Sequence, residues 1–202
     1  MRELKYGYFG EDEAQRIFLE NYLIQLVDYL VKSKEIYFRY DKEFSYLYKG
    51  EKNSTIVDQD FAEAVRVGFI KYQQDVFFVG RDLDSHSEKK LKSKIALMQS
   101  ELDEKNKGKT FLMIPVQCIE HWLWYIKIKL DNPNSTKNIS IESEPNPKAK
   151  KAIYGSPKIS NKKSIPIVEE YSRQIDFDYL ESRSESFREF HNRVKNFVMK
   201  LA

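Results

Sequence analysis

The chain has 202 residues, of which 41% are hydrophobic and 14% aromatic, which is enough apolar material for one substantial core and excludes a disordered protein. Acidic and basic residues nearly cancel to a net charge of +3, so the overall charge indicates no polyanionic partner. The single cysteine, Cys118, excludes an intrachain disulfide, and three scattered histidines give no zinc-ligand spacing. Without a signal-peptide pattern or a long apolar run, we expect a cytoplasmic protein with no membrane contact.

The first 130 residues alternate between short apolar segments and helical patterns. We expect strands near 4–9, 35–40, 75–80 and 110–114. Helices are expected over about 11–32, 58–72, 85–106 and 117–130, the third of them beginning at a serine, Ser85, that can cap it. The continuous run Val-Phe-Phe-Val at 76–79 is typical of a central parallel strand. The alternation therefore predicts an α/β fold whose mainly parallel sheet has helices on both faces.

The composition changes after residue 130. Residues 131–147 are rich in Asn, Ser and Pro, which predicts a loop. Helical patterns return from 148 and end in 184–201, where Ser184 can cap a helix with one apolar face. We therefore divide the chain into an α/β core, residues 1–130, and a loop with a helical extension, residues 131–202, that packs on the core.

Acidic residues directly follow two of the expected strands. Glu11 follows the first strand, and Asp82 and Asp84 follow the third. Ligands of open α/β sheets bind outside the carboxyl ends of the strands, so these three carboxylates can meet there. Carboxylates in close proximity raise one another's pKa unless a cation neutralises them, and oxygen ligands suit Mg²⁺. Taken singly, each group also has an ordinary interpretation, as helix-dipole charge for Glu11 and as a turn or cap for the two aspartates.

Together these residues resemble the Toprim domain of topoisomerases, primases and OLD-family nucleases, in which a glutamate follows the first strand and an Asp-x-Asp pair follows a later one. The resemblance implies a Toprim (Rossmann-like) fold. It also implies a nuclease in which Glu11, Asp82 and Asp84 are the catalytic residues and hold Mg²⁺ or Mn²⁺, which stabilises the phosphodiester transition state.

More narrowly, the chain resembles the RloB-like branch of Toprim proteins, which is associated with bacterial anti-phage defence and abortive infection. The likeness is carried by CIEHWLWYI (118–126), KAKKAIYG (148–155) and SESFREF (184–190). It implies a nuclease that cuts DNA or RNA, tRNA included, and that works with an ABC- or SMC-like ATPase, because the chain has no complete P-loop motif. A homo-oligomer is compatible with it. Two departures, Asp12 in place of glycine and Gln15 in place of a second acid, favour the alternative of a weak or inactive subunit that binds nucleic acid or a partner.

Two further sets of residues have open interpretations. Glu120, like Asp12, is a candidate partner that holds the metal ligands in place, or else a carboxylate that joins the extension to the core. The lysines between 145 and 163 form either a solvated loop or an arm that binds nucleic-acid phosphates. The expected phosphate ligands are Lys148, Lys150, Lys151 and Lys158, and Tyr154 is a candidate for stacking on a base.

The remaining special residues are expected to be structural. Trp122 and Trp124 are assigned to the core. His121 and His191 are expected at the surface or at an interface, with no chemical role. Cys118 lies in an apolar segment and is expected to be unreactive.

Overall fold

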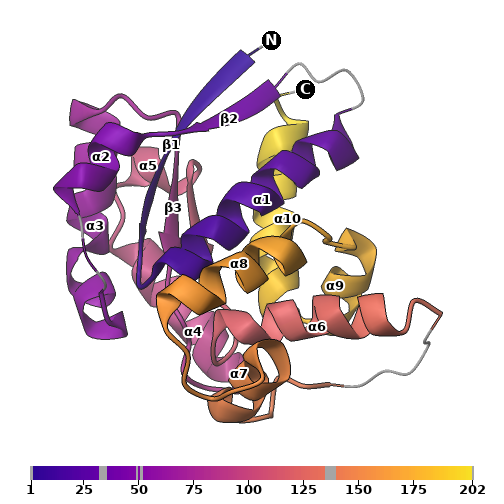
Figure 1. Ribbon diagram of the computed structural model, residues 1–202. Coiled ribbons are helices and arrows are strands. Elements are labelled where there is room, and N and C mark those ends of the chain that lie inside the picture. Colours follow the sequence, from indigo (N-terminus) through magenta and orange to yellow (C-terminus); the bar gives the residue numbers. More distant parts are fainter. Residues whose placement is uncertain (1, 32–35, 49, 51, 135–139, 202) are drawn as a thin grey trace.

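The computed structural model describes residues 2–31, 36–48, 50, 52–134 and 140–201 (Figure 1). It is an α/β fold with one four-stranded sheet in the order β2-β1-β3-β4, and every neighbouring pair is parallel. The strands are β1 (Arg2–Gly10), β2 (Ile36–Tyr40), β3 (Val76–Gly80) and β4 (Thr110–Met113). The four expected strands are therefore confirmed, although residue 35, the expected start of the second, lies outside the described residues.

Helices connect the strands and make up the chain after β4. They are α1 (Glu13–Leu30), α2 (Lys42–Leu47), α3 (Ser54–Lys71), α4 (Glu88–Ser100), α5 (Glu104–Lys107), α6 (Ile119–Asp131), α7 (Asn146–Tyr154), α8 (Asn161–Ser172), α9 (Phe177–Arg183) and α10 (Glu185–Met199). Ser184 caps α10 as expected, by accepting a hydrogen bond from Phe187 N. The expected cap at Ser85 is wrong, because the side chain of Ser87 accepts the bond from Lys90 N and α4 begins one residue later.

The sheet lies between two apolar cores, because successive side chains of a strand point to opposite faces. On β3, Val76 and Phe78 face the core shared with α1, α6 and α8 to α10. Phe77 and Val79 face the core shared with α2, α3 and α4. Figure 1 shows α1, α8 and α10 on one side of the strands and α2 and α3 on the other. Helices therefore cover both faces, as the sequence predicts.

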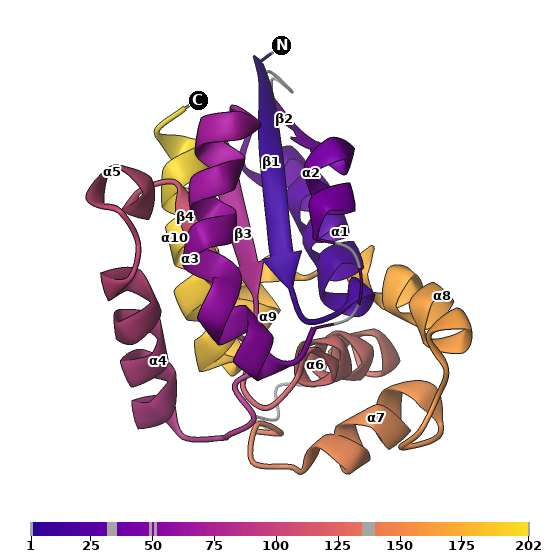
Figure 2. The ribbon, with the colours of Figure 1, turned by 90° about the vertical axis from the view of Figure 1, so that its left-hand side faces the viewer.

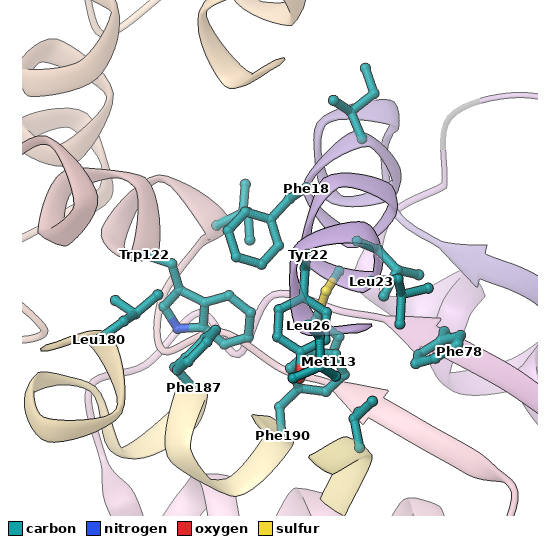
Figure 3. Packing of buried hydrophobic residues seen from close by; sticks show 14 of the residues in the cluster. Phe18, Tyr22, Leu23, Leu26, Phe78, Met113, Trp122, Leu180, Phe187 and Phe190 are labelled. Atoms are coloured by element: carbon teal, nitrogen blue, oxygen red, sulfur yellow. The ribbon is translucent and has the colours of Figure 1, made fainter. Parts of the chain in front are cut away.

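The larger core contains residues from both ends of the chain. Figure 3 shows Trp122 of α6 among aromatic rings of α1 and α10, with ring centroids 5.4 Å from Phe18 and 5.3 Å from Phe187. Such aromatic contacts stabilise a core beyond the area that they bury. Because Phe187 lies in the extension and Phe18 in the first helix, the apolar core crosses the expected boundary at 130/131. None of the helices in the described segments is long and apolar enough to cross a membrane.

His121 and His191, expected at the surface or at an interface, are fully buried inside the protein, so the expected surface position is wrong. The ring of His191 stacks between Phe177 and Phe187, and its Nδ1 lies 3.0 Å from the hydroxyl of Tyr22. His121 Nε2 lies 2.8 Å from the carbonyl oxygen of Glu144. A neutral imidazole is flat enough to pack as an aromatic ring, and the sequence pattern alone does not distinguish this use from an exposed one.

Candidate functional site

The carboxylates lie where the direction of the chain across the sheet reverses. From β1 the chain passes to β2 at one edge, and it then returns past β1 to β3 and β4. Ligands of open α/β sheets bind at such a switch point, outside the carboxyl ends of the strands. Glu11 and Asp82 follow the paired strand ends Gly10 and Gly80, so they share this edge. Figure 2 shows the edge facing α6 and α7.

Glu11 links the two central strands. Its Oε1 accepts a hydrogen bond of 2.8 Å from the backbone N–H of Asp82, and its own N–H donates to the carbonyl oxygen of Gly80 at 3.2 Å. Burial raises the pKa of Glu11 to about 7 against the effect of the Asp82 hydrogen bond, and the charge of Asp84 adds to the rise. Glu11 is thus a carboxyl group that exchanges its proton near neutral pH.

Asp82 is held by a buried chain of side chains. Gln15 Nε2 donates to Asp82 Oδ1 at 2.7 Å, and Tyr8 Oη donates to Gln15 Oε1 at 3.0 Å. The two bonds fix which end of the Gln15 amide faces the carboxylate. Burial first, and then the charges of Asp12, Glu120 and Glu11, raise the pKa of Asp82 well above its ordinary value.

Two glycines make room for this chain. A Cβ at Gly80 would clash with the Tyr8 hydroxyl and with the side-chain oxygen of Gln15, and a Cβ at Gly10 would clash with Tyr8. The side chain of Tyr8 can therefore lie across both strand ends only because neither residue has a side chain. Gly10, which precedes Glu11, is therefore required for the packing of Tyr8.

The segment that carries Asp82 and Asp84 extends the sheet. Backbone N–H groups of Arg81, Leu83 and Asp84 donate, at 3.0 to 3.1 Å, to carbonyl oxygens of the last residue of β4 and of the segment after it. The guanidinium of Arg81 also donates to the carbonyl oxygen of Asp82 and pairs with Asp58 at 2.8 Å. Asp84 is exposed and has φ 55°, a left-handed conformation that Asp tolerates better than most residues. The direction of both aspartates is therefore set by backbone bonds.

Asp12 and Glu120 extend the cluster towards α7. Asp12 caps α1, since its Oδ1 accepts a 2.9 Å bond from Gln15 N, and burial followed by the charge of Glu120 raises its pKa. Glu120 is only 7% exposed, and its Oε1 lies 3.9 Å from Lys150 Nζ. Burial and then Glu120 raise the pKa of Tyr154. Glu120 therefore joins α6 to α7, in agreement with a carboxylate that links the extension to the core, and its charge raises the pKa values of Asp12 and Asp82.

The lysine-rich segment is partly helical rather than a continuous loop. Residues 146–154 form α7, which ends at Gly155 with φ 75°, the left-handed conformation of a helix C-terminus. Lys150 and Lys158 line one cleft together with Asp12 and Glu120. Lys148 is exposed and pairs with Glu144 at 2.8 Å, and Lys151 is exposed on α7. The structure therefore brings two of the four lysines to the carboxylates.

Two clefts flank the carboxylate cluster. One, of about 660 Å³, lies beside Glu11 at the ends of β1 and β2. The other, of about 320 Å³, lies between α1, α6, α7 and α8. Asp12 and Glu13 line both clefts. A long ligand can therefore occupy both sides of the N-terminus of α1.

The donor chemistry at this edge suits a divalent cation. Carboxylate oxygens are the ligands that Mg²⁺ and Mn²⁺ prefer. Burial first, and then the charge of neighbouring carboxylates, raises the pKa values of Glu11, Asp12 and Asp82, and a bound cation would offset both effects. Within the described segments, no three Asp, Glu, His or Cys side chains stand in an arrangement that could hold one ion together. The carboxylates fit a divalent cation by their chemistry but not by their present arrangement, in which Glu11 accepts a bond from Asp82 N and Asp82 accepts one from Gln15.

The residues that position the carboxylates were missed by sequence reasoning. The sequence singles out Gln15 only because it stands in place of an acidic residue. It predicts no role for Tyr8 or Arg81. Arg81 directly precedes Asp82, but its partner Asp58 lies on α3, so no local pattern links the pair. The spacing of Tyr8, Gln15 and Asp82 likewise becomes meaningful only after β1 and β3 pair.

Comparison of the chain with protein-family models, with curated proteins and with solved structures gave no significant match. What the protein does is therefore inferred from its own residues and their geometry.

Proposed function

We propose that the protein is a metal-dependent nuclease that hydrolyses phosphodiester bonds at the carboxyl edge of β1 and β3. The observation that carries the proposal is the gathering of Glu11, Asp12, Asp82, Asp84 and Glu120 at the switch point of the sheet, with three pKa values raised. Carboxylates that gather at a ligand-binding edge, with pKa values raised by burial and by one another, indicate a functional site. The fold and this position agree with the resemblance to Toprim domains of the RloB-like branch.

In this proposal Glu11, Asp82 and Asp84 hold Mg²⁺ or Mn²⁺. The bound ion would stabilise negative charge on the phosphate and lower the pKa of a water molecule. Gln15 orients Asp82, and the ladder after β3 fixes the direction of Asp84. Where Glu11 does not coordinate the ion, its pKa of about 7 would let it accept or return a proton instead. Lys150 and Lys158 bind backbone phosphates from the neighbouring cleft.

The biological setting proposed from the resemblance is anti-phage defence in the cytoplasm. An ABC- or SMC-like ATPase would be the partner that senses the trigger, because the chain itself has no complete P-loop. Gly108-Lys109-Thr110 matches only the end of that motif and leads into strand β4, whereas a P-loop leads into a helix. DNA, RNA and specifically tRNA are the candidate substrates.

The test combines cleavage with metal binding. Purified protein, with and without the candidate ATPase, is incubated with plasmid, single-stranded DNA and total tRNA in Mg²⁺ and in EDTA. Asp82→Ala should abolish Mg²⁺-dependent cleavage and weaken Mn²⁺ binding measured by calorimetry. Glu101→Gln, which changes an exposed carboxylate at the end of α4, should alter neither. Undiminished cleavage by Asp82→Ala would refute the proposal.

One observation favours a second candidate function, a subunit that binds nucleic acid or a partner without cutting. Gln15 already occupies Asp82 Oδ1 and stands where an acid would supply a further ligand. If neither Mn²⁺ nor Mg²⁺ binds while nucleic acid does, this candidate replaces the nuclease.

A further inference from the structure

The larger cleft has an aromatic wall beside the carboxylates. Tyr40, Tyr46 and Tyr48 line it, together with Glu11 and Asp12. Tyr46, on α2, is 64% exposed. The neighbouring Tyr48 is held in place by ring contacts with Phe9 at 5.1 Å and with Phe44 at 5.0 Å. The wall therefore combines an exposed ring with a second ring that contacts the core.

Two of the cations that line this cleft, Arg16 and Lys52, are already engaged, whereas Lys42 lines it as an exposed side chain. Arg16 pairs with Glu13 at 3.2 Å and with Glu20 at 2.9 Å. Lys52 Nζ donates to the carbonyl oxygens of Tyr48 at 2.6 Å and Gly50 at 3.0 Å. A run of phosphates would meet few available positive charges here, and would meet Glu11 and Asp12. The cleft suits an uncharged, planar group better than a phosphate.

The smaller cleft contains two lysines, Lys150 and Lys158, beside the carboxylates of Asp12, Glu13 and Glu120. Lys158 is exposed at its rim, and Lys150 lies inside it with a pKa above the ordinary value, since Glu120 and its neighbours outweigh burial. Positive side chains of this kind bind a phosphate backbone without regard to sequence. Asp12 and Glu13, at the N-terminus of α1, line both clefts. A nucleic-acid strand that passes over these two residues would place a base in the larger cleft and phosphates in the smaller one.

We propose that the larger cleft binds an unpaired base, so that the substrate is a single strand or an unpaired segment of DNA or RNA. Stacking on Tyr46 supplies the affinity, and it requires a base whose face is free. In a duplex both faces of each base are covered and its edge is paired, so the base reaches such a cleft only after it leaves the stack. This inference rests on the proposed nuclease function and adds the class of substrate to it.

Binding is tested without metal, so that no cleavage occurs. Fluorescence anisotropy in EDTA compares labelled single strands of about 15 nucleotides, as DNA and as RNA, with the matching duplexes. Single strands should bind at least about tenfold more tightly than duplexes, and Tyr46→Ala should weaken single-strand binding by roughly tenfold, the effect of losing one stacked base. Tyr46→Phe should keep the wild-type affinity, because the ring remains. The two single-strand arms decide between DNA and RNA.

Matched controls separate this inference from the nuclease itself. Tyr29→Ala removes another exposed tyrosine, 46% exposed near the far end of α1, and should leave all affinities unchanged. Lys158→Gln should weaken single strands and duplexes alike. Equal affinity for both forms, or no effect of Tyr46→Ala, would overturn the assignment of the cleft even if Mg²⁺-dependent cleavage is found. Single-strand preference that depends on Tyr46, without cleavage in Mg²⁺, would support the cleft and overturn the nuclease.

Discussion

Replacing Glu11 by glutamine should stabilise the protein at high pH. The amide of the glutamine keeps an oxygen that can accept the hydrogen bond from Asp82 N, so the exchange removes the charge and little else. The carboxyl group has a pKa of about 7 in the folded protein and 4.5 as the ordinary value. Each pKa unit corresponds to about 1.4 kcal/mol, so the ionised Glu11 lowers the free energy of unfolding by roughly 3 kcal/mol. Glu11 is only half-buried, so we discount the gain for solvent screening to about 1–2 kcal/mol.

The sign of the pH dependence follows from the raised pKa. The folded protein binds the Glu11 proton more tightly than the unfolded chain does. The charge of Glu11 therefore lowers the free energy of unfolding by its full amount above pH 7, and this loss disappears as the pH falls towards 4.5. The gain of Glu11→Gln should therefore be largest near pH 8 and well under half as large near pH 5.

Urea denaturation of both proteins at the two pH values, in EDTA, measures this gain, with Glu101→Gln as the control for a general loss of negative charge. Mn²⁺ should reduce the advantage of Glu11→Gln, because an ion that binds only the folded wild-type protein stabilises it. A variant that is less stable at pH 8, or a gain that is the same at both pH values, would refute the argument that Glu11 is held in a repulsive setting.

Three further predictions concern other parts of the molecule. Burial followed by the charge of Lys195 lowers the pKa of His191 to about 4, so the wild type should lose stability as the pH falls from 6.5 towards 4. His191→Phe should remove roughly 2 kcal/mol of the loss between pH 7 and pH 5, measured by urea denaturation, and an unchanged pH profile would contradict this. Gly80→Ala should displace Tyr8 and Gln15 and destabilise the protein by about 1–3 kcal/mol in thermal or urea melts, whereas Gly108→Ala, which meets nothing within 4 Å, should not. Lys158→Gln should lower the slope of the logarithm of nucleic-acid affinity against the logarithm of salt concentration by about one, and Lys71→Gln, an exposed lysine at the end of α3, should leave it unchanged.

The sheet could be predicted from the sequence because its signals are local. Val-Phe-Phe-Val at 76–79 is apolar on both faces, and this is what a strand between two cores requires. The shared edge of Glu11 and Asp82 also follows from the sequence, since both residues come directly after strands that turn out to be neighbours.

The setting of each carboxylate could not be predicted in the same way. Whether Asp82 faces a cation or an amide depends on Gln15, which is 67 residues away in the chain. The burial of His191 depends on Tyr22, and that of Glu120 on where α7 packs. A solvated loop and a phosphate-binding arm were both open interpretations of the lysines of 148–158. Lys148, Lys150 and Lys151 lie on α7, whose first turn contains Pro147, and the missing N–H of a proline at this position has no intrahelical acceptor to lose.

The backbone pairing that continues the sheet beyond Gly80 divides the site into a rigid half and an adaptable half. Both aspartates belong to a ladder that cannot move without breaking bonds to the segment after β4. Glu11, by contrast, reaches its partner through a side chain, and Lys150 reaches the site from a short helix. Any rearrangement on ligand binding should therefore take place in the side chains of Glu11 and Lys150, while Asp82 and Asp84 serve as the fixed reference against which a ligand is aligned.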